Sequence, residues 1–117
     1  MMLTTKTILP LGALTLALAM PAVAAAQDAA AVKKGEEVYA AQKCSMCHSI
    51  AGKGSKTNPL DGVGAKLSAD DIRLWIVNPT EATAKAKSTK KPPMPAKYGK
   101  LPAADIDALV AYMQSLK

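Results

Sequence analysis

The chain has 117 residues and a net charge of +6, from 15 Lys and Arg against 9 Asp and Glu. This length leaves room for one domain. The modest surplus of positive charge is compatible with acidic proteins, anionic lipid or nucleic acid as partners. Large rings are scarce, with no Phe, one Trp and three Tyr. A core built from the protein's own side chains alone would therefore be marginal at this size.

Residues 1–26 have the layout of a secretory signal. One charge, Lys6, comes first, an uncharged and largely apolar stretch follows, and an alanine-rich end carries an A-x-A pattern. We predict that the signal is cleaved after Ala24 or Ala26, and we assign residues 1–26 to the signal and residues 27–117 to a single domain.

The alternative is an uncleaved membrane anchor, since residues 8–26 hold no charge. Pro10, Gly12 and Pro21 argue against it. Cleavage would remove Lys6 and leave a net charge of +5, from 14 Lys and Arg against 9 acids. Export predicts a periplasmic protein and excludes nucleic acid as a partner.

A first helix is predicted over Asp28 to Cys44, because one face repeats at three- and four-residue steps through Val32, Gly35, Val38, Tyr39 and Gln42. A glycine inside a helix costs about 1 kcal/mol relative to Ala. Gly35 therefore predicts a second element that crosses closely at this point, the alternative being a glycine that is simply tolerated.

Residues 49–67 are rich in Gly, Lys, Asn and Pro, which predicts loop and turn without strands. Ser68 then offers an N-cap with Asp71 three residues later, the start of a short helix through Ile76. Pro79 is predicted to end that helix.

A second long loop is predicted over residues 81–100, which are rich in Pro and Lys. Pro102 suits the first turn of a final helix. That helix has an apolar stripe formed by Ile106, Leu109, Val110, Met113 and Leu116. The domain is therefore expected to be all-α, with helices joined by long loops.

The run Cys44-Ser45-Met46-Cys47-His48 carries the most specific chemistry. Cys-x-x-Cys-His attaches haem c: two thiols form thioethers with the vinyl groups, and the imidazole binds iron. A thioredoxin-like redox pair would need a βαβ context, which the sequence lacks. A zinc site would need a fourth ligand, and His48 is the only histidine in the chain. A disulfide between these two cysteines would close too short a loop to add much stability. We predict one covalent haem c per chain, held through Cys44 and Cys47.

Met94 is the predicted second axial ligand. Three methionines leave with the signal, Met46 lies inside the attachment turn, and Met113 belongs to the apolar stripe of the last helix. Prolines 92, 93 and 95 stiffen the backbone around Met94. The alternative, an exposed loop methionine, would leave the iron open.

Three further residues are candidates around the cofactor. A metal-bound imidazole usually donates its other N–H to a fixed acceptor, for which we predict the Pro59 carbonyl. Trp75 and Arg73 are candidates for hydrogen bonds to the haem propionates. Their ordinary alternatives are packing for Trp75 and a solvated helix charge for Arg73, and we favour the latter for Arg73.

Together these residues resemble the class I cytochrome c family over residues 27–117. The attachment motif matches, Met94-Pro95 with Tyr98 is similar to the family's distal methionine loop, and Thr57-Asn58-Pro59 is similar to the stretch whose proline carbonyl accepts from the axial imidazole. The family's crossing of terminal helices is matched by Gly35, Tyr39, Leu109 and Tyr112. The chain departs from the family at Asn58, where many members have Gly, in its short first loop, and in the Lys-rich stretch before Met94.

The resemblance implies a low-spin His/Met haem, Tyr98 beside it, and three main helices with long loops wrapped around the cofactor. It implies a shuttle of single electrons, not an enzyme, whose partners are redox proteins with acidic docking surfaces and which meets membranes only through membrane-bound partners. Two alternatives stay open: a subunit of a larger oxidoreductase, and a ligand-binding or peroxidase-like haem protein if Met94 does not bind iron.

Overall fold

The computed structural model describes Gly12 and residues 20–117, with side chains from Asp28 onward. Most of the predicted signal, residues 1–26, lies outside the described residues, so its cleavage stays a prediction. Within the described part of the chain, no helix combines the length and the apolar character needed to cross a membrane.

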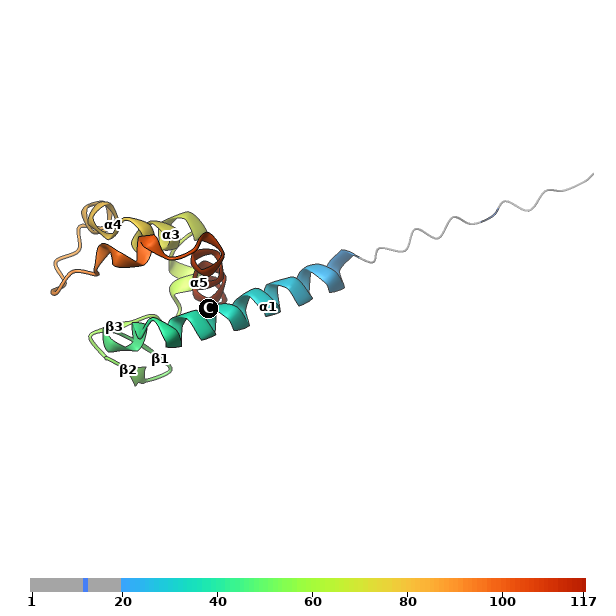
Figure 1. Cartoon of the computed structure of the whole chain (residues 1–117), viewed down its shortest axis with the longest axis horizontal. Coiled ribbons are helices and arrows are strands. Elements are labelled where there is room, and N and C mark those ends of the chain that lie inside the picture. The colour runs from blue at the N-terminus through green and yellow to red at the C-terminus, as the bar shows by residue number, and fades with distance from the viewer. Residues whose placement is uncertain (1–11, 13–19) are drawn as a thin grey trace, which may run out of the picture.

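Helix α1 spans Met20–Ala41 and extends at its N-terminal end beyond the other elements (Figure 1). It begins earlier than the predicted start at Asp28, because residues 22–31 are rich in alanine, the best helix former. It ends before the predicted Cys44, because Lys43 adopts a left-handed conformation with φ 56°.

A small three-stranded sheet follows, in the order β2-β1-β3. Strand β1 (His48–Ile50) pairs antiparallel with β2 (Lys53–Gly54) and parallel with β3 (Asn58–Pro59). The prediction of an unbroken loop over residues 49–67 is therefore wrong, and the short helix α2 (Val63–Lys66) also lies there. Strands of two or three residues are too short for alternation to reveal them.

Helix α3 (Ala69–Val77) begins where the sequence predicts, with the Ser68 hydroxyl accepting from the Asp71 N–H at 3.2 Å. It ends before Pro79, as predicted. Its buried face carries Ile72 and Ile76, which join the core.

The predicted loop over residues 81–100 is wrong in its first part, because helix α4 spans Pro79–Ala86. The Asn78 side chain accepts from the Glu81 N–H at 3.2 Å, and its amide donates to the Glu81 carboxylate at 3.1 Å. This asparagine N-cap, with proline at the first helical position and an acid in the first turn, was visible in the sequence. The 3₁₀ turn η2 (Ala96–Lys100) interrupts the remaining loop.

The last helix, α5 (Ala103–Ser115), crosses α1 at Gly35, as predicted. A Cβ at Gly35 would overlap the Ala108 carbonyl and Cβ of Tyr112, so only glycine lets the backbones approach this closely. The rings of Tyr39 and Tyr112 pack edge to face, with centroids 5.7 Å apart. The buried core around this crossing consists of Val38, Ile72, Ile76, Ile106, Leu109, Val110 and Met113.

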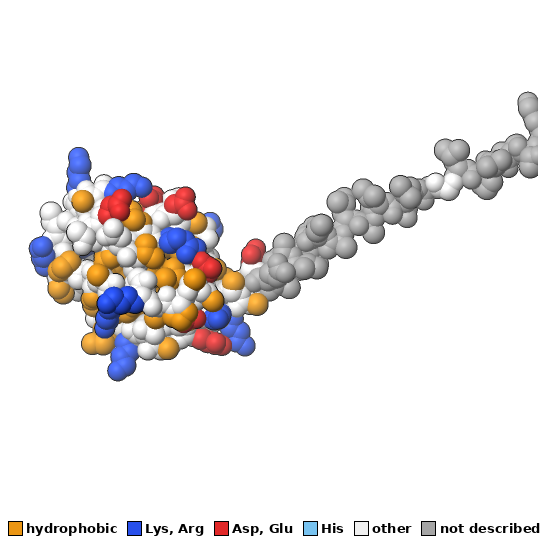
Figure 2. All heavy atoms as spheres, turned by 45° about the horizontal axis from the view of Figure 1, so that its top comes forward, with side chains coloured by type: hydrophobic (Ala, Val, Ile, Leu, Met, Phe, Trp, Pro, Cys, Tyr) orange, Lys and Arg blue, Asp and Glu red, His pale blue; other side chains and the backbone are white. Residues whose placement is uncertain are grey.

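On the face of the domain that Figure 2 shows, Lys and Arg side chains lie both at the margin and within the face, with apolar side chains between them. Exposed ion pairs join α1 to α5, between Lys34 and Asp105 at 3.6 Å, and α3 to α5, between Arg73 and Asp107 at 2.7 Å. Pairs this exposed stabilise little, so the fold depends mainly on the apolar core.

Candidate haem site

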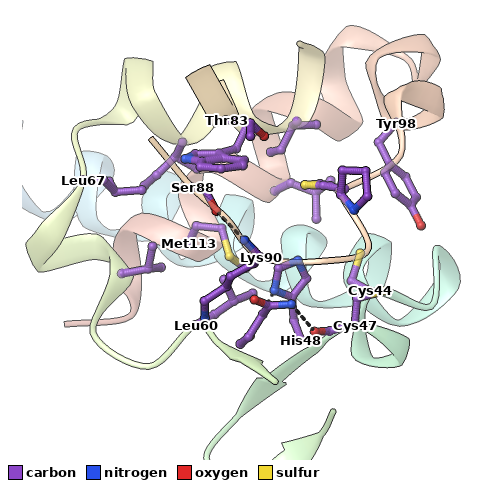
Figure 3. Close-up of a pocket in the computed structure, with 18 of the residues that line it drawn as sticks. Cys44, Cys47, His48, Leu60, Leu67, Thr83, Ser88, Lys90, Tyr98 and Met113 are labelled. Atoms are coloured by element: carbon purple, nitrogen blue, oxygen red, sulfur yellow. Dashed lines mark hydrogen bonds between the residues drawn. The ribbon is translucent and has the colours of Figure 1, made fainter. Parts of the chain in front are cut away.

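A cavity of about 380 Å³ lies among α1, α2, α3, α5 and the segment that leads into η2 (Figure 3). Its size is that of a site for a small molecule or cofactor. Its walls are mostly apolar and include Leu60, Val63, Leu67, Ile72, Ile76 and Leu109. The cavity is therefore an apolar space that continues the apolar core.

The attachment turn forms one side of this cavity. The 3₁₀ turn η1 (Cys44–Met46) closes with the Cys47 N–H donating to the Cys44 carbonyl at 3.2 Å. Both cysteines line the cavity as free thiols, and burial raises the pKa of the Cys44 thiol. Met46 is 74% exposed and is not among the residues that line the cavity.

His48 lies at the start of β1, with its Nδ1 3.0 Å from the Asn58 carbonyl oxygen. A carbonyl can only accept, so Nδ1 carries the hydrogen and Nε2 keeps its lone pair free for a metal. Burial lowers the pKa of His48, while the hydrogen bond to Asn58 opposes that shift. The neutral imidazole that a metal requires is therefore the form present at neutral pH.

The predicted acceptor for His48, the Pro59 carbonyl, is corrected by one residue. In the parallel pairing of β1 with β3, His48 is opposite Asn58 and Ser49 is opposite Pro59. Pro59 lines the cavity, whereas the carbonyl of Asn58 holds the imidazole. The Asn58 side chain also donates to the Cys47 carbonyl at 3.4 Å, which ties β3 to the attachment turn.

Met94 lines the same cavity as Cys44, Cys47 and His48, on the loop between α4 and η2. It is half-buried and has Pro92 and Pro93 beside it in the cavity wall. Met113 also reaches the wall, from α5, while it is only 7% exposed and belongs to the core (Figure 3). The cavity thus has two methionine side chains, and the sequence predicted one of them.

Trp75 and Tyr98 line the cavity too, from α3 and η2. The Tyr98 ring carries the Lys97 ammonium 5.2 Å from its centroid. Arg73 does not line the cavity and instead pairs with Asp107, which agrees with a surface role for this helix charge.

Sequence reasoning did not place Tyr39, Thr83, Ser88 and Lys90 in the cavity wall. The Tyr39 hydroxyl is buried and has no hydrogen-bond partner in the described structure. Burial is the main cause that raises its pKa to about 12, so the hydroxyl keeps its proton. The place of Tyr39 on the inner face of α1 was the one signal available. Thr83 lies on α4, a helix that the sequence reasoning missed, while Ser88 and Lys90 depend on how the loop after α4 folds back.

The residues present fit a covalently bound haem. Two free thiols and a neutral imidazole stand at one side of an apolar cavity, and thioether side chains reach the cavity from other segments. Within the described residues, no group of three or more His, Cys, Asp or Glu is placed so that it could hold a metal ion.

Comparison with known proteins gives one finding that bears on this site. A family model described as Cytochrome c matches residues 32–117, which include every cavity residue named above. No solved structure matches the chain.

Proposed function

Because the chain belongs to the cytochrome c family, we propose that it is a periplasmic electron carrier with one haem c per chain, ligated by His48 and Met94. The family implies a covalently bound haem c and haem-based electron transfer. Each of Cys44 and Cys47 would add across one vinyl group, so that a sulfur–carbon bond forms and the thiol hydrogen goes to the other vinyl carbon. This addition needs no oxidant.

The observation that carries the proposal is the convergence of both cysteines, the histidine and Met94 on one apolar cavity. These residues come from two segments separated by more than forty positions in the sequence. A structural role alone would not bring two free thiols, an imidazole with a free Nε2 and a thioether to the same space.

Each group has a distinct task in this proposal. Asn58 fixes the His48 ring through Nδ1, which orients Nε2 toward the cavity and raises its basicity as a ligand. When bound, the haem supplies a one-electron ferric/ferrous couple. Apolar walls exclude water, and burial together with methionine ligation raises the reduction potential. If His48 and Met94 both held the iron, no position would remain for a substrate on the metal, and we therefore propose that the chain is not an enzyme.

Met94 is preferred to Met113 as the second ligand because of where each residue sits. Met113 packs in the core on α5 and is 7% exposed. Met94 is half-buried in a loop whose backbone lies outside helices and strands. Its side chain can therefore turn to the iron without opening the core.

The test compares Met94→Leu with Met113→Leu in protein exported by a host that attaches haem. Leucine keeps the volume and removes the sulfur, so both variants should fold. We expect Met94→Leu to lose the long-wavelength charge-transfer band of methionine-ligated ferric haem, and Met113→Leu to keep it. The reverse result would assign Met113 as the ligand, and loss of the band in neither variant would exclude both.

Acidic redox proteins are the proposed partners. Lys43, Lys53 and Lys56 near the attachment turn are exposed, and so are the lysines that flank Met94, namely Lys85, Lys87, Lys90, Lys91, Lys97 and Lys100. Complementary charge would speed the encounter and weaken with added salt. Contact with a membrane would come through membrane-bound partners, and co-purification in a fixed ratio would instead favour a subunit of a larger oxidoreductase.

A further inference from the structure

Lys90 differs in charge from the other residues around the cavity. Among the described residues that line it, Lys90 is the only Lys, Arg, Asp or Glu. Its side chain is exposed as well as lining the cavity, which places it at the cavity mouth. A cation at the edge of an apolar cavity calls for a reason beyond solubility.

The Lys90 ammonium is held in place. It donates to the carbonyl of Thr57 at 3.2 Å, across 33 residues of sequence, and the Lys90 N–H lies 3.4 Å from the Ser88 hydroxyl. Thr57 directly precedes Asn58, whose carbonyl holds His48. In the described part of the chain no carboxylate lies within ion-pair distance of Lys90, so its charge has no counter-ion.

The chemistry of haem c defines what this cation would meet. The two propionates leave the porphyrin on the half away from the vinyl groups, and Cys44 and Cys47 mark the vinyl side of the cavity. Thr83 and Ser88 lie away from the two cysteines in Figure 3, and the Lys90 N–H lies 3.4 Å from the Ser88 hydroxyl. The segment that carries Lys90 therefore reaches the half of the cavity where the propionates would lie. A carboxylate beside apolar walls is costly unless a donor or a cation pairs with it.

We propose that the Lys90 ammonium binds a haem propionate, in place of or together with the Thr57 carbonyl. This inference depends on the covalent haem of the proposed function. Neutralising the propionate would favour the ferrous state, because a nearby cation opposes the extra positive charge of ferric iron. It would also fasten the loop that carries Met94 to the cofactor, so that Lys90 acts as a positioning residue for the distal ligand.

The experiment measures the midpoint potential of the haem-containing protein in Lys90→Gln, Lys90→Arg and the matched control Lys91→Gln. Lys91 is also exposed and loses the same charge, but it does not line the cavity. We expect Lys90→Gln to lower the equilibrium constant for reduction roughly three- to tenfold. Lys90→Arg should stay within about twofold of wild type, because it keeps the charge.

Salt separates a bound carboxylate from a diffuse surface charge. At high ionic strength the effect of Lys90→Gln should persist, whereas any effect of Lys91→Gln should vanish. Equal shifts in Lys90→Gln and Lys91→Gln, or a Lys90→Gln shift that disappears in salt, would overturn the proposal. Haem content and the charge-transfer band are recorded for every protein, and their absence in wild type would contradict the proposed function instead.

Discussion

Two segments supply the proposed iron ligands, and they are built differently. The proximal segment, residues 44–59, carries His48 in a three-stranded sheet, and the Ser55 N–H also donates to the Ser45 carbonyl at 2.9 Å. The distal segment, residues 87–95, carries Met94 and has no helix or strand. Within the distal segment the Lys90 N–H faces the Ser88 hydroxyl, and the Lys90 ammonium donates to the Thr57 carbonyl in the proximal segment.

This difference indicates how the positions of the two proposed ligands are controlled. The sheet and the hydrogen bond to the Asn58 carbonyl orient His48 without any contribution from the distal segment. The position of Met94 depends instead on the prolines around it and on the contact of Lys90 with Thr57. We therefore expect the proximal segment to resist opening and to tolerate substitution poorly, and the distal segment to behave in the opposite way.

The largest effect is expected from removing both thiols of the proximal segment. Cys44→Ala/Cys47→Ala should abolish covalent haem, because no other cysteine exists in the chain. Haem staining after denaturing electrophoresis checks this, with Met46→Ala as a control in the same turn. Haem that remains covalently attached in the double variant would refute the assignment.

Backbone substitutions compare the two segments next. Gly54 in β2 has φ +106°, and a Cβ there would overlap the His48 carbonyl, so Gly54→Ala should destabilise by about 1–3 kcal/mol. Lys87 has φ 51°, which glycine adopts freely, so Lys87→Gly should change stability by less than about 1 kcal/mol. Denaturant unfolding measures both, and equal losses would remove the contrast.

Limited proteolysis tests the same contrast without mutation. Trypsin should cleave after Lys87 roughly tenfold faster than after Lys53 and Lys56, because local opening of the distal segment costs less free energy. All three side chains are exposed, so exposure alone does not distinguish them. Mass spectrometry of the first fragments gives the order, and first cleavage after Lys53 or Lys56 would reverse the comparison.

The smallest effect concerns the support of the distal segment. Lys85 on α4 pairs with Asp71 on α3, and this contact lowers the pKa of Asp71 from 3.8. The pair therefore stabilises the fold above pH 3.8, and this contribution is lost as the pH falls through the lower folded-state pKa. Asp71→Asn should produce a slight loss of stability at pH 7 and none at acid pH, measured by thermal unfolding. A loss that is independent of pH would point to packing instead.

Much of the site could be predicted because it depends on short, specific signals. The attachment pentapeptide, the proline-flanked Met94 and Gly35 at the helix crossing each require a residue type that few other roles explain. The acceptor for His48 was missed by one residue, since a two-residue parallel pairing leaves no periodicity that fixes its register. Lys90 was missed because its contact with Thr57 spans 33 residues and depends on the loop path. Helix α4 was missed although Asn78 and Glu81 signalled it.

The measurement that tests the central claim most directly is carbon monoxide titration of the exported, reduced wild-type protein. If His48 and Met94 both bind iron and the chain serves to carry electrons, the spectrum should be that of a covalent six-coordinate haem and should change little on addition of carbon monoxide. Stoichiometric binding of carbon monoxide would show an open or easily displaced axial position and would contradict the account in favour of a ligand-binding haem protein.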